Sequence, residues 1–348
     1  MHGPGGARVN VSGSVELRHG SLVRRHDAVL LDLDGVVRVG PRPVPHAVPV
    51  LGRLREAGCR TAYVTNNAGR PPAELAGELR RLGLEVADGD VVTSAQAAAR
   101  LVAERCAQGA PVLVVGSPAL RTAVAGQGLR PVASERDAPA AVVQGFAPTV
   151  SWRELAEAGY AVARGVPWIV TNTDLTAPTQ RGVAPGNGAL VAVVRAATGA
   201  DPAVAGKPSA ALFREAAERT GARRPLMVGD SLDTDVEGAR RAGYDSLLVL
   251  TGRTGPADLL AAPPHRRPTH VGRDLRALCA PPQAAERQPD GAWRCRDWQA
   301  RVTGGQVLLA GHGELSAGLW AACAAAWSAP VPPDPTRALA VLGRLPES

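Results

Sequence analysis

The residues whose types could perform chemistry together are four aspartates, one lysine and a small polar pair. They stand at the ends of apolar runs or at the starts of helical patterns: Asp32, Asp34, Thr65, Asn66, Lys207, Asp230 and Asp235. Clustered carboxylates would repel one another, and a hard divalent cation such as Mg²⁺ relieves that repulsion through oxygen ligands. The ammonium, the hydroxyl and backbone amides near Gly35 and Asn66 suit a dianionic phosphate. The set therefore predicts a magnesium site that handles a phosphate group.

The pair Asp32 and Asp34 can divide the work of moving a phosphoryl group. They stand two residues apart in a predicted strand, so their side chains point to the same face. A carboxylate can be the nucleophile and form an aspartyl-phosphate. A second acid can protonate the leaving alkoxide and later take a proton from water. We expect one of the two to attack phosphorus and the other to move protons.

Lys207 is conspicuous because it is the single lysine among 39 basic residues. Arginine carries a planar fork of donors, whereas lysine carries a compact point charge. A site that needs the compact charge cannot accept arginine in its place. The survival of Lys207 in so arginine-rich a chain therefore indicates a functional position.

Each motif also has a purely structural explanation when it is taken alone. The Asp-Gly pair at 34–35 is a common turn signal, and Thr-Asn at 65–66 could cap a helix. Lys-Pro at 207–208 could start a helix, and residues 229–235 could form a loop with a helix cap. Their joint appearance, in order and at successive strand ends, favours a functional site.

The elements that must position these residues alternate between short apolar runs and helical patterns, which is typical of an open α/β sheet. Strands are expected at 28–35, 61–65, 111–115, 140–144, 168–171, 225–228, 246–250 and 268–272, and helices at 44–57, 72–82, 94–107, 118–126, 151–163, 188–197, 207–219 and 235–242. Residues 172–188 are predicted to be a turn-rich loop. Ligands bind outside the carboxyl ends of the strands in such sheets, where the polar residues stand.

The order of the elements predicts an α/β chain in which a second unit interrupts the first. The expected divisions are a flexible N-terminal tail (1–20), a core (21–92 and 199–279), an inserted α/β unit (93–198), a linker (280–292) and a C-terminal extension made of a hairpin and a helix (293–348).

The composition excludes several classes of partner. The net charge is +7, but the arginines come as dispersed pairs between acids, and few aromatics could stack bases, which argues against nucleic acid. The most apolar helical stretch, 315–329, is too short to span a bilayer, so no membrane partner is expected. Five scattered cysteines without a C-x-x-C pair indicate a reducing compartment, and we expect a cytoplasmic protein.

The motifs resemble those of the haloacid dehalogenase (HAD) superfamily. The matching segments are DLDGVV at 32–37, VTNN at 64–67, GKP at 206–208 and VGDSLDTD at 228–235. The inserted unit, with its segments 171–179 and 185–188, resembles the cap and substrate loop of the NagD-like subgroup IIA. With its extension, the chain is similar to actinobacterial glycerol-3-phosphate phosphatases of that subgroup. The resemblance covers about residues 26–279.

This resemblance implies a Rossmann-like HAD core with a parallel sheet, a large inserted α/β cap domain and a small α+β C-terminal extension. It implies that Asp32 is the nucleophile and a metal ligand. Asp34 would be the general acid and base, with its backbone carbonyl on Mg²⁺. Lys207 would neutralise the phosphate and the Asp32 carboxylate. Asp230 would bind the metal, and Asp235 would support the metal's ligands.

On the substrate side, the resemblance implies that Thr65 and the Asn66 amide hold the phosphate near Gly35. Three cap residues are expected to recognise the leaving group: Asn172, Asp174 and Arg181. The alternative for these three is a turn-rich loop held together by its own asparagine and aspartate side chains.

The activity expected from all of this is Mg²⁺-dependent hydrolysis of a small phosphate monoester, with glycerol 3-phosphate as the substrate suggested by the resemblance. Other small substrates stay open: 2-phosphoglycolate, nucleoside monophosphates, sugar phosphates and p-nitrophenyl phosphate. A phosphomutase and a catalytically silent binding protein are the alternatives from other classes. The cap is the expected surface for any homo-oligomer.

Overall fold

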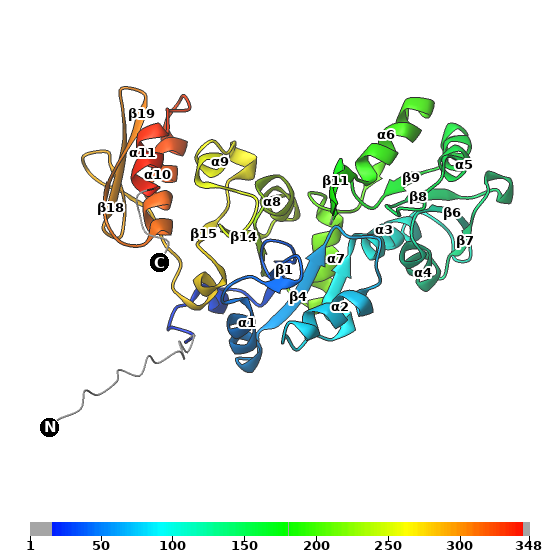
Figure 1. Ribbon diagram of the computed structural model, residues 1–348, viewed down its shortest axis with the longest axis horizontal. Helices are drawn as coiled ribbons and strands as arrows, with labels where there is room; N and C mark the ends of the chain where they lie inside the picture. The colour runs from blue at the N-terminus through cyan, green and yellow to red at the C-terminus, as the bar shows by residue number, and fades with distance from the viewer. Residues whose placement is uncertain (1–15, 180, 344–348) are drawn as a thin grey trace.

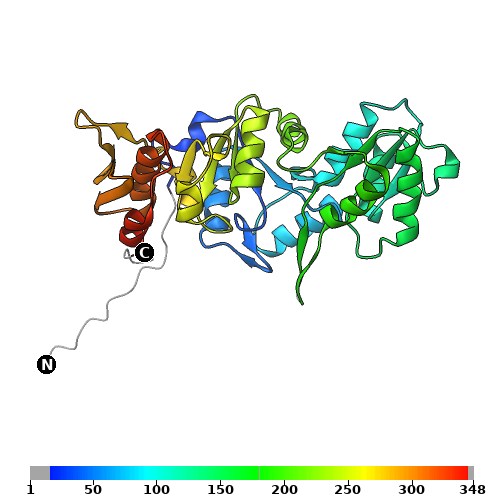
Figure 2. The same ribbon diagram turned by 90° about the horizontal axis from the view of Figure 1, so that it is seen from above.

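The computed structural model describes residues 16–179 and 181–343, which form three units in a row (Figure 1). A unit built on a parallel sheet occupies the middle. The helices and strands of residues 94–204 lie on one side of it, and those of residues 286–342 lie on the opposite side (Figure 2). The two flanking units therefore approach the central sheet from opposite ends.

The central sheet joins parallel strands in the order β15-β14-β13-β1-β4-β5. Their bounds are Ala28–Asp32 (β1), Arg60–Thr65 (β4), Val91–Thr93 (β5), Pro225–Gly229 (β13), Asp245–Val249 (β14) and His270–Gly272 (β15). Strand β1 lies between β13 and β4, with Leu31 opposite Val228 and Asp32 opposite Val64. The carboxyl ends of these three strands therefore meet at one edge of the sheet, as predicted.

Both faces of the central sheet are covered by helices. The elements are α1 (Ala47–Glu56), α2 (Pro72–Arg81), α7 (Ala210–Thr220), α8 (Glu237–Ala242), α9 (Pro256–Leu260) and the short 3-10 segment η6 (Leu275–Cys279). Val29 and Leu31 pack with α1, α2 and η6 on one face, whereas Leu30 packs with α7 and α8 on the other. Burial on both faces explains why the run in β1 is continuously apolar.

The inserted unit has its own parallel sheet, in the order β12-β9-β8-β6-β7. Its strands are Pro111–Val115 (β6), Arg130–Val132 (β7), Ala141–Gln144 (β8), Trp168–Val170 (β9) and Ala203–Val204 (β12), and its helices are α3 (Ser94–Ala103), α4 (Pro118–Gly126), α5 (Trp152–Ala163) and α6 (Asn187–Thr198). Helices α3 and α4 share an apolar cluster with the central unit, and α5 and α6 cover the other face. The sheet confirms the predicted α/β class of the insertion.

The prediction of a loop over 172–188 is wrong for part of that segment. Strands β10 (Thr176–Thr179) and β11 (Gly182–Pro185) pair as an antiparallel hairpin. Two prolines, Pro178 and Pro185, hide the strand signal in the sequence. A two-stranded ribbon tolerates proline because each of its strands has an unpaired edge.

The C-terminal extension is richer than the predicted hairpin and helix. Its elements are β16 (Glu286–Arg287), β17 (Trp293–Cys295), β18 (Trp298–Thr303), β19 (Gln306–Gly311), α10 (Leu315–Ser328) and α11 (Thr336–Leu342). The predicted first strand is divided in two because Arg296 adopts a left-handed turn conformation with φ 53°. The expected linker contributes β16, which pairs with β17.

Helix α10 is apolar around its whole circumference, as a helix buried on all sides must be. Leu319, Ala322 and Cys323 are fully buried between the extension's sheet and the central unit. This confirms the interpretation of 315–329 as a buried helix. None of the helices in the described ranges combines the length and apolar character needed to cross a bilayer.

The last residues of the predicted N-terminal tail contact the central unit. The backbone N–H of Arg18 donates to the carbonyl of Cys279 at 3.0 Å. Leu17 packs against the same apolar core as β1. The rest of the predicted tail, residues 1–15, lies outside the described residues.

Candidate functional site

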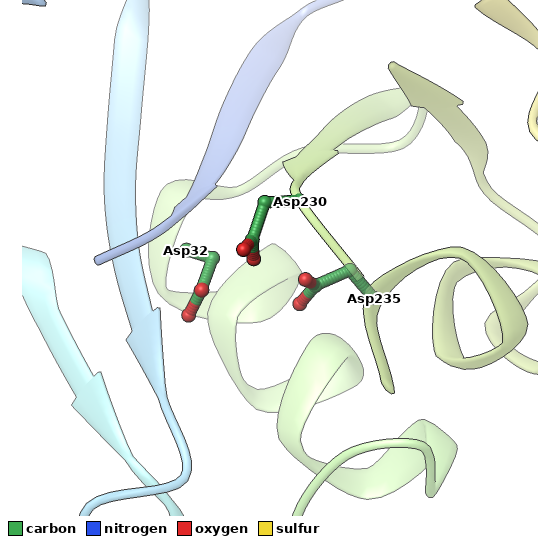
Figure 3. A group of neighbouring side chains, drawn as sticks. All are labelled: Asp32, Asp230 and Asp235. Carbon is green, nitrogen blue, oxygen red and sulfur yellow. The ribbon is translucent and has the colours of Figure 1, made fainter. Parts of the chain in front are cut away.

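Three carboxylates from distant parts of the sequence meet at the edge of the central sheet (Figure 3). Asp32 ends β1, Asp230 follows β13, and Asp235 lies in the π-helical turn η4 (Leu232–Val236). Oxygen atoms of the three side chains lie within 4.8 Å of one another. The predicted convergence of these acids is therefore present in the fold.

Lys207 enters this cluster from the segment before α7 and is 4% exposed. Its Nζ donates to Asp32 Oδ1 at 2.5 Å and to Asp235 Oδ1 at 2.7 Å. Burial alone would lower the pKa of Lys207, but Asp235 and Asp32 raise it above its ordinary value. The ammonium therefore stays charged between the two carboxylates.

The charges of the cluster leave room for a divalent cation. Asp32, Asp230 and Asp235 contribute three negative charges and Lys207 one positive charge, so the net charge of the cluster is −2. The three acids offer carboxylate oxygens, the ligands preferred by Mg²⁺ and Ca²⁺. The residues present therefore fit a hard divalent cation.

Asp230 is held between two glycines. A Cβ atom at Gly35 would lie 2.4 Å from Asp230 Oδ2, and one at Gly252 would lie 1.9 Å from it, so larger residues cannot occupy either position. The N–H of Arg253 donates to Asp230 Oδ2 at 2.7 Å. The hydroxyl of Thr251 donates to the carbonyl of Gly35 at 2.6 Å. Burial and the Asp32 charge raise the pKa of Asp230, a cost that a bound cation would remove.

Asp235 is the most deeply buried acid of the cluster, with 1% of the residue exposed. Its Oδ2 accepts from the N–H of Ser231 at 3.2 Å. A Cβ atom at Gly229 would lie 2.2 Å from that of Asp235, which explains the glycine before Asp230. Burial raises the pKa of Asp235 to about 7, while the Lys207 ammonium opposes the rise.

Asp34 stands at the rim of the cluster, where 68% of its side chain is exposed. Arg38 Nε lies 3.3 Å from Asp34 Oδ1. Desolvation by the surrounding protein raises the pKa of Asp34 above its ordinary value, and Arg38 acts in the opposite direction. Because solvent reaches most of the side chain, the desolvation is only partial.

An arginine network beside Asp34 was not predicted. Glu78 of α2 accepts from Arg38 Nη1 at 2.9 Å and from Arg70 Nη1 at 2.9 Å. The network therefore fixes the arginine that contacts Asp34. Arginine is so common in this chain that no feature of the sequence singles out Arg38 or Arg70.

The residues expected to hold a phosphate lie at or just after the ends of β4 and β1. Thr65 is buried, and its Oγ1 accepts from the N–H of Asn67 at 3.1 Å. The N–H of Gly35 donates to the carbonyl of Arg38 at 2.8 Å. Thr65 and Gly35 thus stand at the ends of β4 and β1, at the same edge of the sheet as the acids.

Asn66 joins the central unit to the inserted one. Its Oδ1 accepts from the N–H of Lys207 at 2.8 Å, and its carbonyl accepts from Asn172 Nδ2 at 2.8 Å. Asn187 Nδ2 in turn donates to the carbonyl of Asn172 at 2.7 Å. Three of the chain's five asparagines therefore form one connected group where the central and inserted units meet. Their scarcity in the sequence is the signal that could have revealed it.

Of the three cap residues expected to recognise a leaving group, Asp174 and Asn172 both contact Asn66 beside the cluster. Asp174 does so with its carboxylate. Its Oδ2 accepts from Asn66 Nδ2 at 3.2 Å, and burial raises its pKa against the effect of that hydrogen bond. Asn172 is 5% exposed, and its Oδ1 accepts from the N–H of Asp174 at 3.2 Å. Arg181 lies in the exposed turn of the β10–β11 hairpin. Substrate contacts by these residues stay a prediction.

Comparisons with known proteins agree with this geometry. Residues 29–130 match the family described as haloacid dehalogenase-like hydrolase, and residues 204–278 match one described as HAD-hydrolase-like. A D-glycerol 3-phosphate phosphatase from Mycobacterium tuberculosis is 47% identical over 295 residues, which cover 85% of this chain and 81% of that protein.

Solved structures give the same picture. A glycerol phosphate phosphatase from Mycobacterium tuberculosis in complex with magnesium superposes with a TM-score of 0.85 at 45% identity, over 93% of this chain and 98% of that one. A p-nitrophenyl phosphatase from Archaeoglobus fulgidus superposes with a TM-score of 0.67 at 30% identity, over 73% of this chain and 98% of that one.

Proposed function

The chain belongs to the haloacid dehalogenase-like hydrolases, and from this we propose that it is a Mg²⁺-dependent phosphatase acting on small phosphate monoesters. The observation that carries the proposal is the contact between Lys207 and Asp32 at 2.5 Å, inside a cluster of three carboxylates. A nucleophile, a fixed cation and a metal-binding set then surround one position at the sheet edge.

In the first chemical step, a carboxylate oxygen of Asp32 forms a bond to phosphorus, and the bond from phosphorus to the ester oxygen breaks. Asp34 donates its proton to that leaving oxygen, and the alcohol departs. The raised pKa of Asp34 favours the protonated form that this step requires. The products of the step are the free alcohol, an aspartyl-phosphate at Asp32 and an ionised Asp34.

In the second step, Asp34 takes a proton from a water molecule as the water oxygen attacks phosphorus. The bond between phosphorus and Asp32 breaks, which releases inorganic phosphate and restores both acids. Lys207 stabilises negative charge at Asp32 throughout. Mg²⁺ held by Asp32, Asp230 and the Asp34 carbonyl, with Asp235 in support, would supply the positive charge that draws the phosphate toward the nucleophile.

Glycerol 3-phosphate is the proposed substrate. Its support is the 47% identical mycobacterial relative, which is named for that activity. Asp174, which hydrogen-bonds Asn66 at the edge of the acid cluster, is the cap residue best placed to contact the hydroxyl groups of such a substrate. We propose that Thr65, Asn66 and Gly35 hold the phosphate, and that Asn172 and Arg181 of the cap help to recognise the leaving group.

A substrate panel tests the proposal. Purified protein would be incubated with glycerol 3-phosphate, 2-phosphoglycolate, a nucleoside monophosphate, a sugar phosphate and p-nitrophenyl phosphate, and free phosphate would be measured. We expect the highest kcat/KM with glycerol 3-phosphate, and no release from any ester once a chelator removes Mg²⁺. Absence of release from every ester with Mg²⁺ present would instead support a phosphomutase or a silent binding protein.

The network around Asp34 gives a second test of the mechanism. Glu78→Ala frees Arg38 and Arg70, so Asp34 loses its fixed neighbour. We expect kcat for glycerol 3-phosphate to fall about three- to tenfold, the scale of a misplaced proton donor. The first step with p-nitrophenyl phosphate, measured as the burst of p-nitrophenolate, should change less than about twofold, because this leaving group departs without a proton.

The matched control is Glu74→Ala, one turn earlier on α2. Glu74 lies 3.4 Å from Arg70 Nε and is not among the partners of Arg38. Glu74→Ala should keep the rates measured with both substrates within about twofold of those of the unmodified enzyme. If Glu78→Ala lowered the p-nitrophenolate burst rate as much as kcat for glycerol 3-phosphate, Glu78 would support the fold and not the proton donor.

We also infer where the protein works and how it could associate. The five cysteines are free thiols, which supports the cytoplasm as its location. Trp152 and Tyr160 on α5 are 76% and 55% exposed, and they support the cap as a surface for a homo-oligomer.

A further inference from the structure

The C-terminal extension, residues 286–342, shares one apolar core with elements of the central unit that adjoin the acids. Val236, Leu248 and Leu259 of the central unit are buried in the same cluster as α10 and the extension's sheet. All three are at most 1% exposed. The extension is therefore packed into the central unit and is not a separate appendage.

Trp327, near the end of α10, makes polar contacts across this interface. Its Nε1 donates to the carbonyl of Leu259 in α9 at 3.3 Å. The guanidinium of Arg267 lies 5.1 Å from the centre of the Trp327 ring, and its Nη1 donates to the Trp327 carbonyl at 3.4 Å. Trp327 therefore links α10 to α9 and to Arg267.

Helix α9 is directly connected to the loop that holds Asp230. We call residues 250–255, between β14 and α9, the supporting loop. Leu250, at the start of the supporting loop, packs against the extension's core, and α9, which follows the loop, packs against α10. Between these anchors, Arg253 and Thr254 donate backbone hydrogen bonds to Asp230 at 2.7 and 3.1 Å. Both ends of the supporting loop are therefore fixed by the extension.

The turn that carries Asp235 meets the same apolar core. Val236 is 1% exposed within it, and Leu232 packs against it from the other end of η4. Asp235 lies between these two residues in the sequence. The supports of both Asp230 and Asp235 thus converge on the extension.

From these contacts we propose that the C-terminal extension positions the metal-binding acids, with Trp327 as its main positioning residue. The inference rests on the proposed Mg²⁺ site. Mg²⁺ requires nearly ideal octahedral geometry at short distances, whereas Ca²⁺ accepts longer and more variable ones. A loosened supporting loop therefore weakens Mg²⁺ binding more than Ca²⁺ binding.

The test measures metal binding to the full chain by calorimetry, without substrate. In Trp327→Ala we expect the Mg²⁺ Kd to rise about three- to tenfold, somewhat below the effect of removing a direct partner of a ligand. The Ca²⁺ Kd should rise less than about twofold. A role confined to stability lowers Tm without changing this preference between the two metals.

Trp293→Ala is the matched control. Trp293 is also a partly buried tryptophan of the extension, but its Nε1 donates to Ser328 Oγ inside the extension at 3.1 Å. We expect both metal affinities to stay within about twofold of the unmodified protein, although Tm falls. Trp327→Phe keeps an aromatic ring but loses part of the indole and its bond to Leu259, and it should raise the Mg²⁺ Kd about twofold. This variant covers the case in which Trp327→Ala does not fold.

The outcomes separate the inference from the function on which it rests. Equal shifts in the two alanine variants, or equal shifts for the two metals in Trp327→Ala, would overturn the positioning role alone. If the unmodified protein binds neither metal, the proposed phosphatase site fails, and the inference fails with it. A selective loss of Mg²⁺ affinity in Trp327→Ala and Trp327→Phe supports both.

Discussion

Asp32→Asn is expected to abolish phosphate release, with kcat lowered at least about 10⁴-fold, the scale found when a catalytic nucleophile is removed. The amide has nearly the same shape as the carboxylate but cannot form the aspartyl-phosphate. It also removes the negative charge that Lys207 contacts at 2.5 Å. The measurement is free phosphate released from glycerol 3-phosphate at saturating Mg²⁺.

Two controls make this result specific to the nucleophile. Circular dichroism should show an unchanged fold, because the substitution is isosteric and Asp32 ends its strand at the sheet edge. Asp34→Asn incubated with p-nitrophenyl phosphate should accumulate a phosphorylated enzyme, detectable by mass spectrometry, since the second step lacks its base. Rapid turnover by Asp32→Asn, or a phosphoryl group trapped on another residue, would contradict the assignment of Asp32.

Lys207→Arg is the second large expected effect, and its charge conservation makes it informative. We expect kcat to fall about 10²- to 10³-fold, as when one fixed electrostatic donor is displaced. The Lys207 side chain is 3% exposed, and its single nitrogen contacts Asp32 and Asp235 at once. A planar guanidinium cannot occupy that space without moving one of the two acids. The readouts are kcat and Tm, both of which should fall.

An exposed arginine supplies the matched control for the exchange of these two cations. Arg195→Lys changes a residue on α6 that pairs with Asp201 at 2.7 Å, with 61% of the arginine side chain exposed. Activity and Tm should both stay within the error of measurement, because exposed ion pairs contribute little. If Lys207→Arg behaved like Arg195→Lys, a compact charge between the acids would not be needed.

Much of the fold and of the site could be predicted because the signals are local. Residues 28–31 are apolar at every position, as a strand buried on both faces must be, and Asp32 ends the strand as the first of the acids. Helix α4 occupies the predicted 118–126, since proline near its start and a helical apolar pattern mark it within a few residues. The likeness to a known family then assigned the acids at successive strand ends to one site.

The contacts that support the site could not be read from the sequence. Arg38, Glu78 and Arg70 are brought together only by the packing of α2 beside β1, and nothing local distinguishes these charged residues from many others. Asn172 donates to the carbonyl of Asn66, which is 106 positions away in the sequence, and no local pattern encodes that pairing.

By itself, the sequence determined most of the strands and helices of the central and inserted units and which acids stand at strand ends, because both follow from patterns a few residues long. Only the tertiary structure decided which supports those acids receive. Trp327 of the extension contacts Leu259 of α9, beside the supporting loop, although the two residues are 68 positions apart in the sequence. Such a contact depends on how whole units pack against each other, and no short pattern encodes that geometry.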